Sequence, residues 1–329
     1  MTGHGENRKL PGGGPIAILG AGSLGQLWAG YLPAGRVAFV PRAGSPGPET
    51  EPLSYRLQQF DGTSVPVTVP WLNESAGHPP LLLVTTKAGD TLNAIEPLLP
   101  SLPPETPLVL FQNGMGSQQS AAERWPQRPV LAASTTEGAN RPEPGQTIHA
   151  GKGETWVGPL TDCAETVLGP VVQALATSGL TIHPDTSIHQ RLWDKLVINA
   201  GINAFTAILD CRNGDILDAP FYLDHIDDLC KEIADVLMAE GCQPQAPVSI
   251  RKRIESVARS TARNTSSMLS DRQQGRTTEI DYINGYIACR GQAHGISVTV
   301  NQMLTQQVKE LSADVKAGKS TNQIEPGAS

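Results

Sequence analysis

The stretch that decides the fold lies near the N-terminus and reads PIAILGAGSLG over residues 15–25. Residues 15–19 form the short apolar run that is typical of a buried parallel strand, and three glycines follow with G-x-G-x-x-G spacing. Such a loop between a strand and a helix binds a dinucleotide, because its glycines permit a tight turn, close approach of a diphosphate and close helix packing. We therefore predict a cofactor loop over residues 20–25, followed by a helix to about Tyr31. The alternative is a glycine-rich turn without a ligand.

The end of the next predicted strand, residues 37–40, indicates which dinucleotide is bound. An NAD site usually has an acidic residue there for the ribose 2′-hydroxyl, but no Asp or Glu occurs between Glu6 and Glu49. Arg42 stands at this position instead, and its guanidinium fork suits a 2′-phosphate. The pattern favours NADP(H), although Arg42 could also be an ordinary surface arginine.

The rest of the N-terminal half continues the alternation of strands and helices. Further strands are predicted at residues 81–86, 107–111 and 130–134, with a helix at about 90–98 and a long surface loop at 41–52. Residues 147–149 and 155–157 resemble a hairpin joined through Gly151 and Gly153. This order predicts an α/β fold with a doubly wound parallel sheet of the Rossmann type.

The pattern becomes helical after Pro184. Helices are predicted near residues 187–209, 219–241, 246–260, 276–294 and 299–316. We therefore expect a Rossmann-type NADP-binding domain at 15–184 and an all-helical substrate and catalytic domain at 185–318, with a cleft between them. Residues 1–14 read as a flexible extension and 319–329 as a disordered tail.

The first of these helices carries an unusual polar stripe. Lys195, Asn199 and Asn203 recur every fourth residue, so they share one helix face, while their neighbours are apolar and favour burial. A buried ammonium or amide is costly without a partner, so the stripe is suited to hold a polar ligand. The alternative is a core helix whose polar residues are satisfied internally.

Composition narrows the functional classes. The chain has 329 residues and a net charge of −7, which argues against nucleic-acid binding. The one basic cluster, residues 251–253, has apolar residues at helical spacing and reads as a solvated helix face. Five scattered cysteines lack metal-type or redox spacing, so no metal site is predicted and a reducing cytoplasm fits. We find no secretory signal and no membrane-spanning apolar run, which predicts a soluble cytoplasmic protein.

A further candidate, Asn113, directly follows a predicted strand. Ligands of open α/β sheets collect at the carboxyl ends of strands, and Lys87 ends the neighbouring strand at the same edge. An Asn-Gly pair can also be a plain turn.

Several segments together resemble the ketopantoate reductases (2-dehydropantoate 2-reductases). They are the glycine loop, the turn at 112–116, the polar-stripe helix, the pair at 213–214 and the block at 266–285. They occur in the order and spacing of that family, and the resemblance runs from about residue 15 to about 311. The strings SSML at 266–269 and TEIDYING at 278–285 are its most specific parts. By itself, Glu279 reads as a solvated carboxylate on an amphipathic helix, and the resemblance overrides that interpretation.

The resemblance implies NADPH-dependent reduction of 2-dehydropantoate to pantoate, in the biosynthesis of pantothenate and coenzyme A. It also implies a helical domain like that of 6-phosphogluconate dehydrogenase. Lys195 matches the family's proton donor. Substrate-binding positions match Asn113, Asn199, Asn203, Asn213 and Ser267. Cofactor-binding positions match Gly20, Ala21, Gly22, Ser23, Leu24, Gly25, Arg42, Lys87, Asn113, Ala139 and Glu279.

The chain departs from the family pattern at two places near the cofactor edge. Residues 88–90 read Ala-Gly-Asp where Ala-x-Gln is expected, and Glu137 stands where a neutral residue or His is common. Two other functions therefore stay open. One is a paralogous NADPH-dependent reductase of another 2-oxo acid, and the other is a non-catalytic NADPH-binding regulatory protein. The expected partner is a small 2-oxo acid, and the chain could be a monomer or a homodimer.

Overall fold

A computed structural model describes residues 10–42 and 51–316, and its contacts divide the chain into two compact units, Met1–Arg191 and Leu192–Ser329. The division falls inside one long helix, α6 (Ile188–Leu209). The domain boundary expected after residue 184 stays a prediction, as does the tail at 319–329, which lies outside the described residues.

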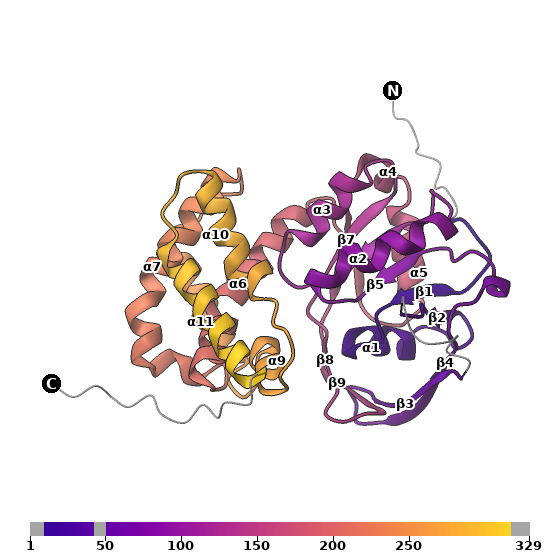
Figure 1. Cartoon of the computed structure of the whole chain (residues 1–329), viewed down its shortest axis with the longest axis horizontal. Coiled ribbons are helices and arrows are strands. Elements are labelled where there is room, and N and C mark those ends of the chain that lie inside the picture. The colour runs from indigo at the N-terminus through magenta and orange to yellow at the C-terminus, as the bar shows by residue number, and fades with distance from the viewer. Residues whose placement is uncertain (1–9, 43–50, 317–329) are drawn as a thin grey trace. The chain divides into compact units, whose positions relative to one another are not determined.

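The first unit is built on a seven-stranded sheet of order β11-β10-β7-β6-β5-β1-β2 (Figure 1). Every pairing in it is parallel except that of β10 with β7. Its strands are β1 (Ile16–Leu19), β2 (Val37–Phe39), β5 (Leu82–Val84), β6 (Leu108–Leu110), β7 (Val130–Thr135), β10 (Thr155–Pro159) and β11 (Ile182–Pro184). The predicted doubly wound, mostly parallel sheet is confirmed.

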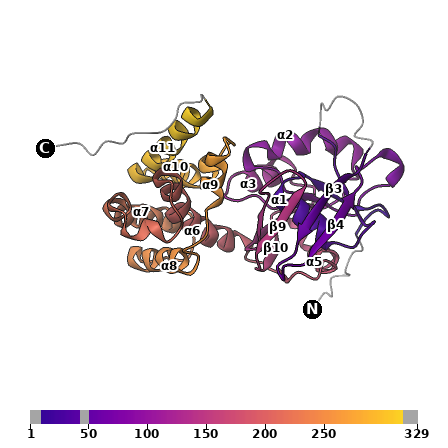
Figure 2. The same ribbon diagram turned by 90° about the horizontal axis from the view of Figure 1, so that it is seen from below.

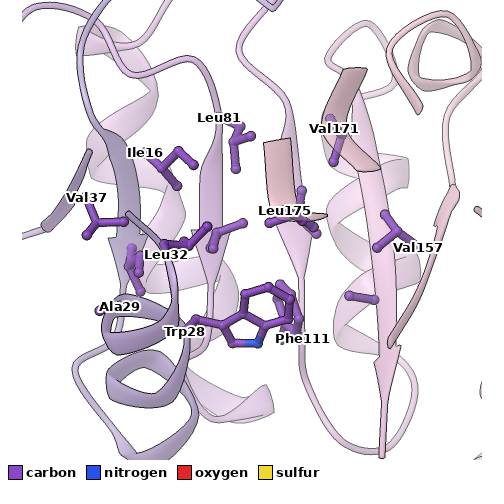
Figure 3. Packing of buried hydrophobic residues seen from close by; sticks show 14 of the residues in the cluster. Ile16, Trp28, Ala29, Leu32, Val37, Leu81, Phe111, Val157, Val171 and Leu175 are labelled. Atoms are coloured by element: carbon purple, nitrogen blue, oxygen red, sulfur yellow. The ribbon is translucent and has the colours of Figure 1, made fainter. Parts of the chain in front are cut away.

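Alternating residues of the buried strands supply a separate core on each face of this sheet. Ile16 and Ile18 of β1 point into one core, which holds α1 and α5 (Figure 3). Ala17 and Leu19 point into the other, which holds α2 and α3. The helices are α1 (Ser23–Tyr31), α2 (Thr91–Ile95), α3 (Ser117–Arg124), α4 (Asp162–Glu165) and α5 (Leu168–Ala176), with 3₁₀ turns η1 (Glu74–Ala76), η2 (Ala88–Asp90) and η3 (Glu96–Ser101).

A second sheet, of order β4-β3-β9-β8, replaces part of the predicted arrangement. Its strands are β3 (Leu53–Gln58), β4 (Ser64–Val69), β8 (Gly138–Asn140) and β9 (Gln146–Gly151). The predicted hairpin of residues 147–149 with 155–157 is wrong, because β9 pairs with β3 and β8 whereas β10 pairs with β7 and β11. Each of the two strands therefore has partners other than its predicted one. The β3–β4 hairpin was not predicted, and residues 43–50 of the expected loop lie outside the described residues.

The second sheet covers α1, which packs between it and the main sheet (Figure 1). The Tyr55 hydroxyl of β3 donates to the carbonyl of Gln26, at 2.6 Å. Gly30 allows the close approach, because a Cβ there would lie 2.6 Å from the Leu57 side chain. The helix that opens at the glycine loop is therefore held from two sides.

The second unit is helical (Figure 2). After α6 it contains α7 (Pro220–Ala239), α8 (Pro247–Ser260), α9 (Ser267–Gln273), α10 (Asn284–Ala293) and α11 (Thr299–Lys316), with 3₁₀ turns η4 (Asp215–Asp218) and η5 (Ile280–Tyr282). The single helix predicted at 276–294 is wrong. Ile283 has φ −112° and ψ −96°, so η5 and α10 are separate. Within the described parts of the chain, no helix has the length and apolar character needed to cross a membrane.

Candidate functional site

The glycine loop has the geometry that its spacing predicts. Gly20 has φ +110°, and a Cβ there would lie 2.9 Å from the Thr86 nitrogen. A Cβ on Gly25 would lie 2.0 Å from the Gly20 oxygen, so only glycine lets α1 approach the turn. A Cβ on Gly22, by contrast, would meet no atom within 4 Å. This open space at the N-terminus of α1 fits a dinucleotide diphosphate, which the exposed backbone N–H groups can bind.

The carboxyl ends of neighbouring strands bring the other predicted cofactor residues to the same edge. Lys87 follows β5 and Asn113 follows β6, and both are half-buried, while Arg42 follows β2 and is exposed. The strands β6, β5, β1 and β2 are consecutive in the sheet, so these residues and the glycine loop line one edge.

Two glutamines that the sequence did not single out shape this edge. The Gln112 side-chain amide donates to the carbonyls of Val84 and Thr86, at 3.0 and 3.2 Å. The Gln118 amide donates to the carbonyls of Gln112 and Gly114, at 3.0 and 3.1 Å. These bonds tie the turn that carries Asn113 to the end of β5. The partners of Gln112 are distant backbone atoms, so no local pattern identifies its role.

Glu137, noted as a departure from the family pattern, is buried and hydrogen-bonded. Its Oε2 lies 2.6 Å from His149 Nε2 and accepts from the N–H of Gly153 at 2.9 Å. The other ring nitrogen of His149 lies 2.8 Å from the Tyr31 hydroxyl, at the end of α1. This Glu137–His149–Tyr31 chain joins β9 and the residue before β8 to α1, and Ala139 of β8 is a predicted cofactor residue.

In the second unit, Lys195 is half-buried on α6 together with Asn199, and Asn203 is buried. Burial lowers the pKa of the Lys195 ammonium from 10.5 to about 8, while the negative charge of Glu279 acts in the opposite direction. Glu279 is half-buried at the start of η5, so its interpretation as a solvated carboxylate on an amphipathic helix is wrong. The two charges are electrostatically coupled inside one unit.

The remaining predicted substrate residues lie on segments that pack near α6. The Ser266 hydroxyl caps α9 by accepting from the N–H of Leu269 at 3.1 Å, and lies 2.7 Å from the Thr206 hydroxyl of α6. Ser267 is thereby presented as an exposed residue at the start of α9. Asn213 is buried and donates its amide to the Thr261 hydroxyl at 3.0 Å, so part of its polar capacity serves the protein itself.

The parallel sheet, the glycine loop and the lysine-bearing helical unit together define a Rossmann-type, dinucleotide-dependent oxidoreductase. The family model described as ketopantoate reductase PanE/ApbA matches residues 16–162, and the model of its C-terminal part matches residues 187–312. A 2-dehydropantoate 2-reductase of Vibrio cholerae is 36% identical over 313 residues, which cover 90% of this chain and 97% of that relative. The chain belongs to the ketopantoate reductase family, as the resemblance predicted.

Solved structures agree on the fold. A D-mandelate dehydrogenase in complex with NADH and anilino(oxo)acetate aligns with a TM-score of 0.80 at 21% identity, covering 92% of this chain and 99% of that one. A dimeric ketopantoate reductase from Staphylococcus aureus aligns with a TM-score of 0.75 at 18% identity, covering 91% and 99%. At such identities the likeness establishes the architecture and leaves the substrate open.

Proposed function

We propose that the protein reduces 2-dehydropantoate to pantoate with NADPH, a step in the biosynthesis of pantothenate and coenzyme A. The observation that carries the proposal is a half-buried lysine of lowered pKa, on one helix stripe with two asparagines. Relatives that share a third of their residues with this chain over nearly their whole length carry the name of that reaction. The proposal places the enzyme in the cytoplasm, as a monomer or a homodimer, without nucleic-acid partners.

Lys195 is the proposed proton donor. NADPH, when bound, supplies the hydride that reduces the ketone carbon. Negative charge then develops on the ketone oxygen, and an ammonium held beside that oxygen stabilises the charge and delivers the proton. With a pKa of about 8, Lys195 is mostly protonated at neutral pH and is a stronger acid than an ordinary lysine.

The polar residues around Lys195 are the proposed substrate ligands. Asn199 and Asn203 lie one and two turns further along α6, so their amides extend the same stripe. An amide can both donate and accept hydrogen bonds, which suits a substrate that carries hydroxyl and carboxylate groups. Asn113, Asn213 and Ser267 complete the proposed set.

The proposed cofactor site uses the loop from Gly20 to Gly25, with the diphosphate over Gly22. Arg42 is assigned to the 2′-phosphate, which is the reason to expect NADPH rather than NADH. Lys87, Asn113, Ala139 and Glu279 complete this set.

The decisive experiment follows the loss of NADPH absorbance when 2-dehydropantoate is added to the purified protein, and repeats it with NADH. We expect rapid oxidation of NADPH, slower oxidation of NADH, and almost none with Lys195→Ala. A panel of other 2-oxo acids, including benzoylformate, is assayed in parallel. If kcat/KM is higher for one of these acids than for 2-dehydropantoate, that acid is the substrate instead. Binding of NADPH without oxidation across the whole panel would favour the regulatory alternative.

A further inference from the structure

An arginine that is not among the predicted site residues contacts the glycine loop. Arg141 follows β8, and its Nη1 donates to the carbonyl of Ala21 at 3.2 Å. The side chain is half-buried, and its Nε is buried without a hydrogen-bond partner. Among the residues that the structure describes, Arg141 forms no ion pair. A partly buried cation that lacks a counter-charge is suited to pair with an anionic ligand.

The hydrogen bond to Ala21 does not explain why the residue is an arginine. The Gln26 side-chain amide already donates to the same carbonyl, at 3.1 Å. A second neutral donor would serve the loop equally well, whereas the guanidinium adds a positive charge and further N–H groups.

The positive charge of Arg141 also lies close to the N-terminus of α1, where a cation is unfavourable. Ala21 directly precedes Gly22, the N-cap of the helix, whose N-terminus carries the positive end of the helix dipole. The first turn of α1 has no acidic residue, and the cap has no side-chain hydrogen bond. Two positive features therefore lie beside Gly22, whose Cβ position is open, and this combination indicates an anionic ligand.

We propose that Arg141 is a further cofactor-binding residue, whose guanidinium pairs with the diphosphate of the bound dinucleotide. The inference rests on the proposed NADPH-dependent function. It gives the two arginines separate roles, since Arg42 is assigned to the 2′-phosphate and Arg141 to the diphosphate that NADPH and NADH share.

Direct binding measurements test this division without turnover. Isothermal titration of the purified full chain gives Kd for NADPH and for NADH. We expect Arg141→Ala to raise both Kd values by about tenfold or more, which is the scale of a lost charge-assisted hydrogen bond. Arg42→Ala should raise only the Kd for NADPH. The slope of log Kd against log salt concentration should become shallower in Arg141→Ala, because one charge contact is lost.

Further substitutions of Arg141 distinguish its positive charge from its hydrogen bond to the Ala21 carbonyl. Arg141→Gln keeps a donor for the Ala21 carbonyl but loses the charge, and should bind as weakly as Arg141→Ala. Arg141→Lys keeps the charge and should recover part of the affinity. Arg56→Ala, at an exposed arginine of the same four-stranded sheet, serves as the matched control and should bind like the wild type. Unchanged thermal unfolding of each variant establishes that it is folded.

Three results would overturn the assignment. They are wild-type affinity of Arg141→Ala for both dinucleotides, weakened binding of NADPH alone, and full recovery by Arg141→Gln. If the wild-type chain itself binds neither dinucleotide, the proposed function fails as well, so the two failures are distinguishable.

Discussion

Lys195 should give the enzyme a pH dependence that an ordinary lysine would not. The protonated amine is the proposed acid, and burial brings its pKa to about 8. We therefore expect kcat for ketone reduction to be high below about pH 8 and to fall as the pH rises through that value. Lys195→Arg stays protonated across this range, so its low residual rate should not fall near pH 8. A wild-type kcat that stays constant to about pH 10 would contradict the assignment.

Lys195 and Asn203 should differ in which kinetic constant they control. Lys195→Ala removes a group that acts in the transition state, so kcat should fall by about 10²- to 10⁴-fold with little change in KM. Asn203→Ala removes a substrate contact and should also raise KM, by about tenfold. Steady-state kinetics with 2-dehydropantoate measures both. Asn93→Ala, at an exposed asparagine of α2, is the matched control and should match the wild type.

Glu137, which pairs with the buried His149, should contribute more to stability than Glu154, which pairs with the half-exposed His183. The Glu137 side chain is almost fully buried with that of His149, and Glu137→Gln weakens their hydrogen-bonded network. We expect the free energy of unfolding to fall by about 1–3 kcal/mol in urea titrations. Glu154→Gln breaks the half-exposed pair with His183 and should cost less than about 1 kcal/mol. Equal losses in the two variants would show that burial does not distinguish these pairs.

Gly201 of α6 lies close to Ile254 of α8. A Cβ on Gly201 would lie 2.5 Å from the Ile254 side chain. Gly201→Ala gains about 1 kcal/mol of helix propensity but overpacks this contact by about 1–3 kcal/mol, so we expect net destabilisation. Urea unfolding of Gly201→Ala, of Ile254→Ala and of the double variant measures the coupling. The double variant should lose less free energy of unfolding than the two single variants lose in sum. Strictly additive losses would exclude the steric explanation.

Elements set by local signals were predictable from the sequence, and elements set by distant partners were not. The strand, loop and helix at residues 16–31 follow one another in a self-contained pattern, so their prediction matched the structure. The strand β9 carries a similar local pattern, but it pairs with the preceding strand β8 and with β3, which lies about ninety residues earlier, rather than with the following strand β10. An Asn-Gly pair follows the break at Ile283, but Ile280, Ile283 and Ile287 keep helical spacing across it, which is why the predicted helix ran through it.

The same distinction holds for the candidate site. The glycine loop and the polar stripe of α6 were visible as spacing, and the family resemblance supplied the roles of single residues. Gln112 and Arg141 escaped notice because their functions depend on bonds to the backbone of segments 28 and 120 residues away. A glutamine or arginine at such a distance has no periodic partner in the sequence.

At the level of the whole molecule, the proposed cofactor residues come from both units. The glycine loop, Arg42, Lys87, Asn113 and Ala139 belong to the first unit, whereas Glu279 belongs to the second. Binding stabilises the states that bind the ligand, so each assigned residue predicts slower local opening in its own unit. Hydrogen exchange of the full chain with saturating NADPH should therefore show protection at residues 20–25 and also around η5.

Glu279→Ala makes this prediction specific. The variant loses the second-unit contact but keeps the glycine loop, so NADPH should still protect residues 20–25 while protection around η5 disappears. Asp281→Ala, which removes a more exposed carboxylate of the same turn, should keep both regions protected. Protection confined to the first unit in the wild-type chain would mean that Glu279 does not contact the cofactor, and that its negative charge serves Lys195 alone.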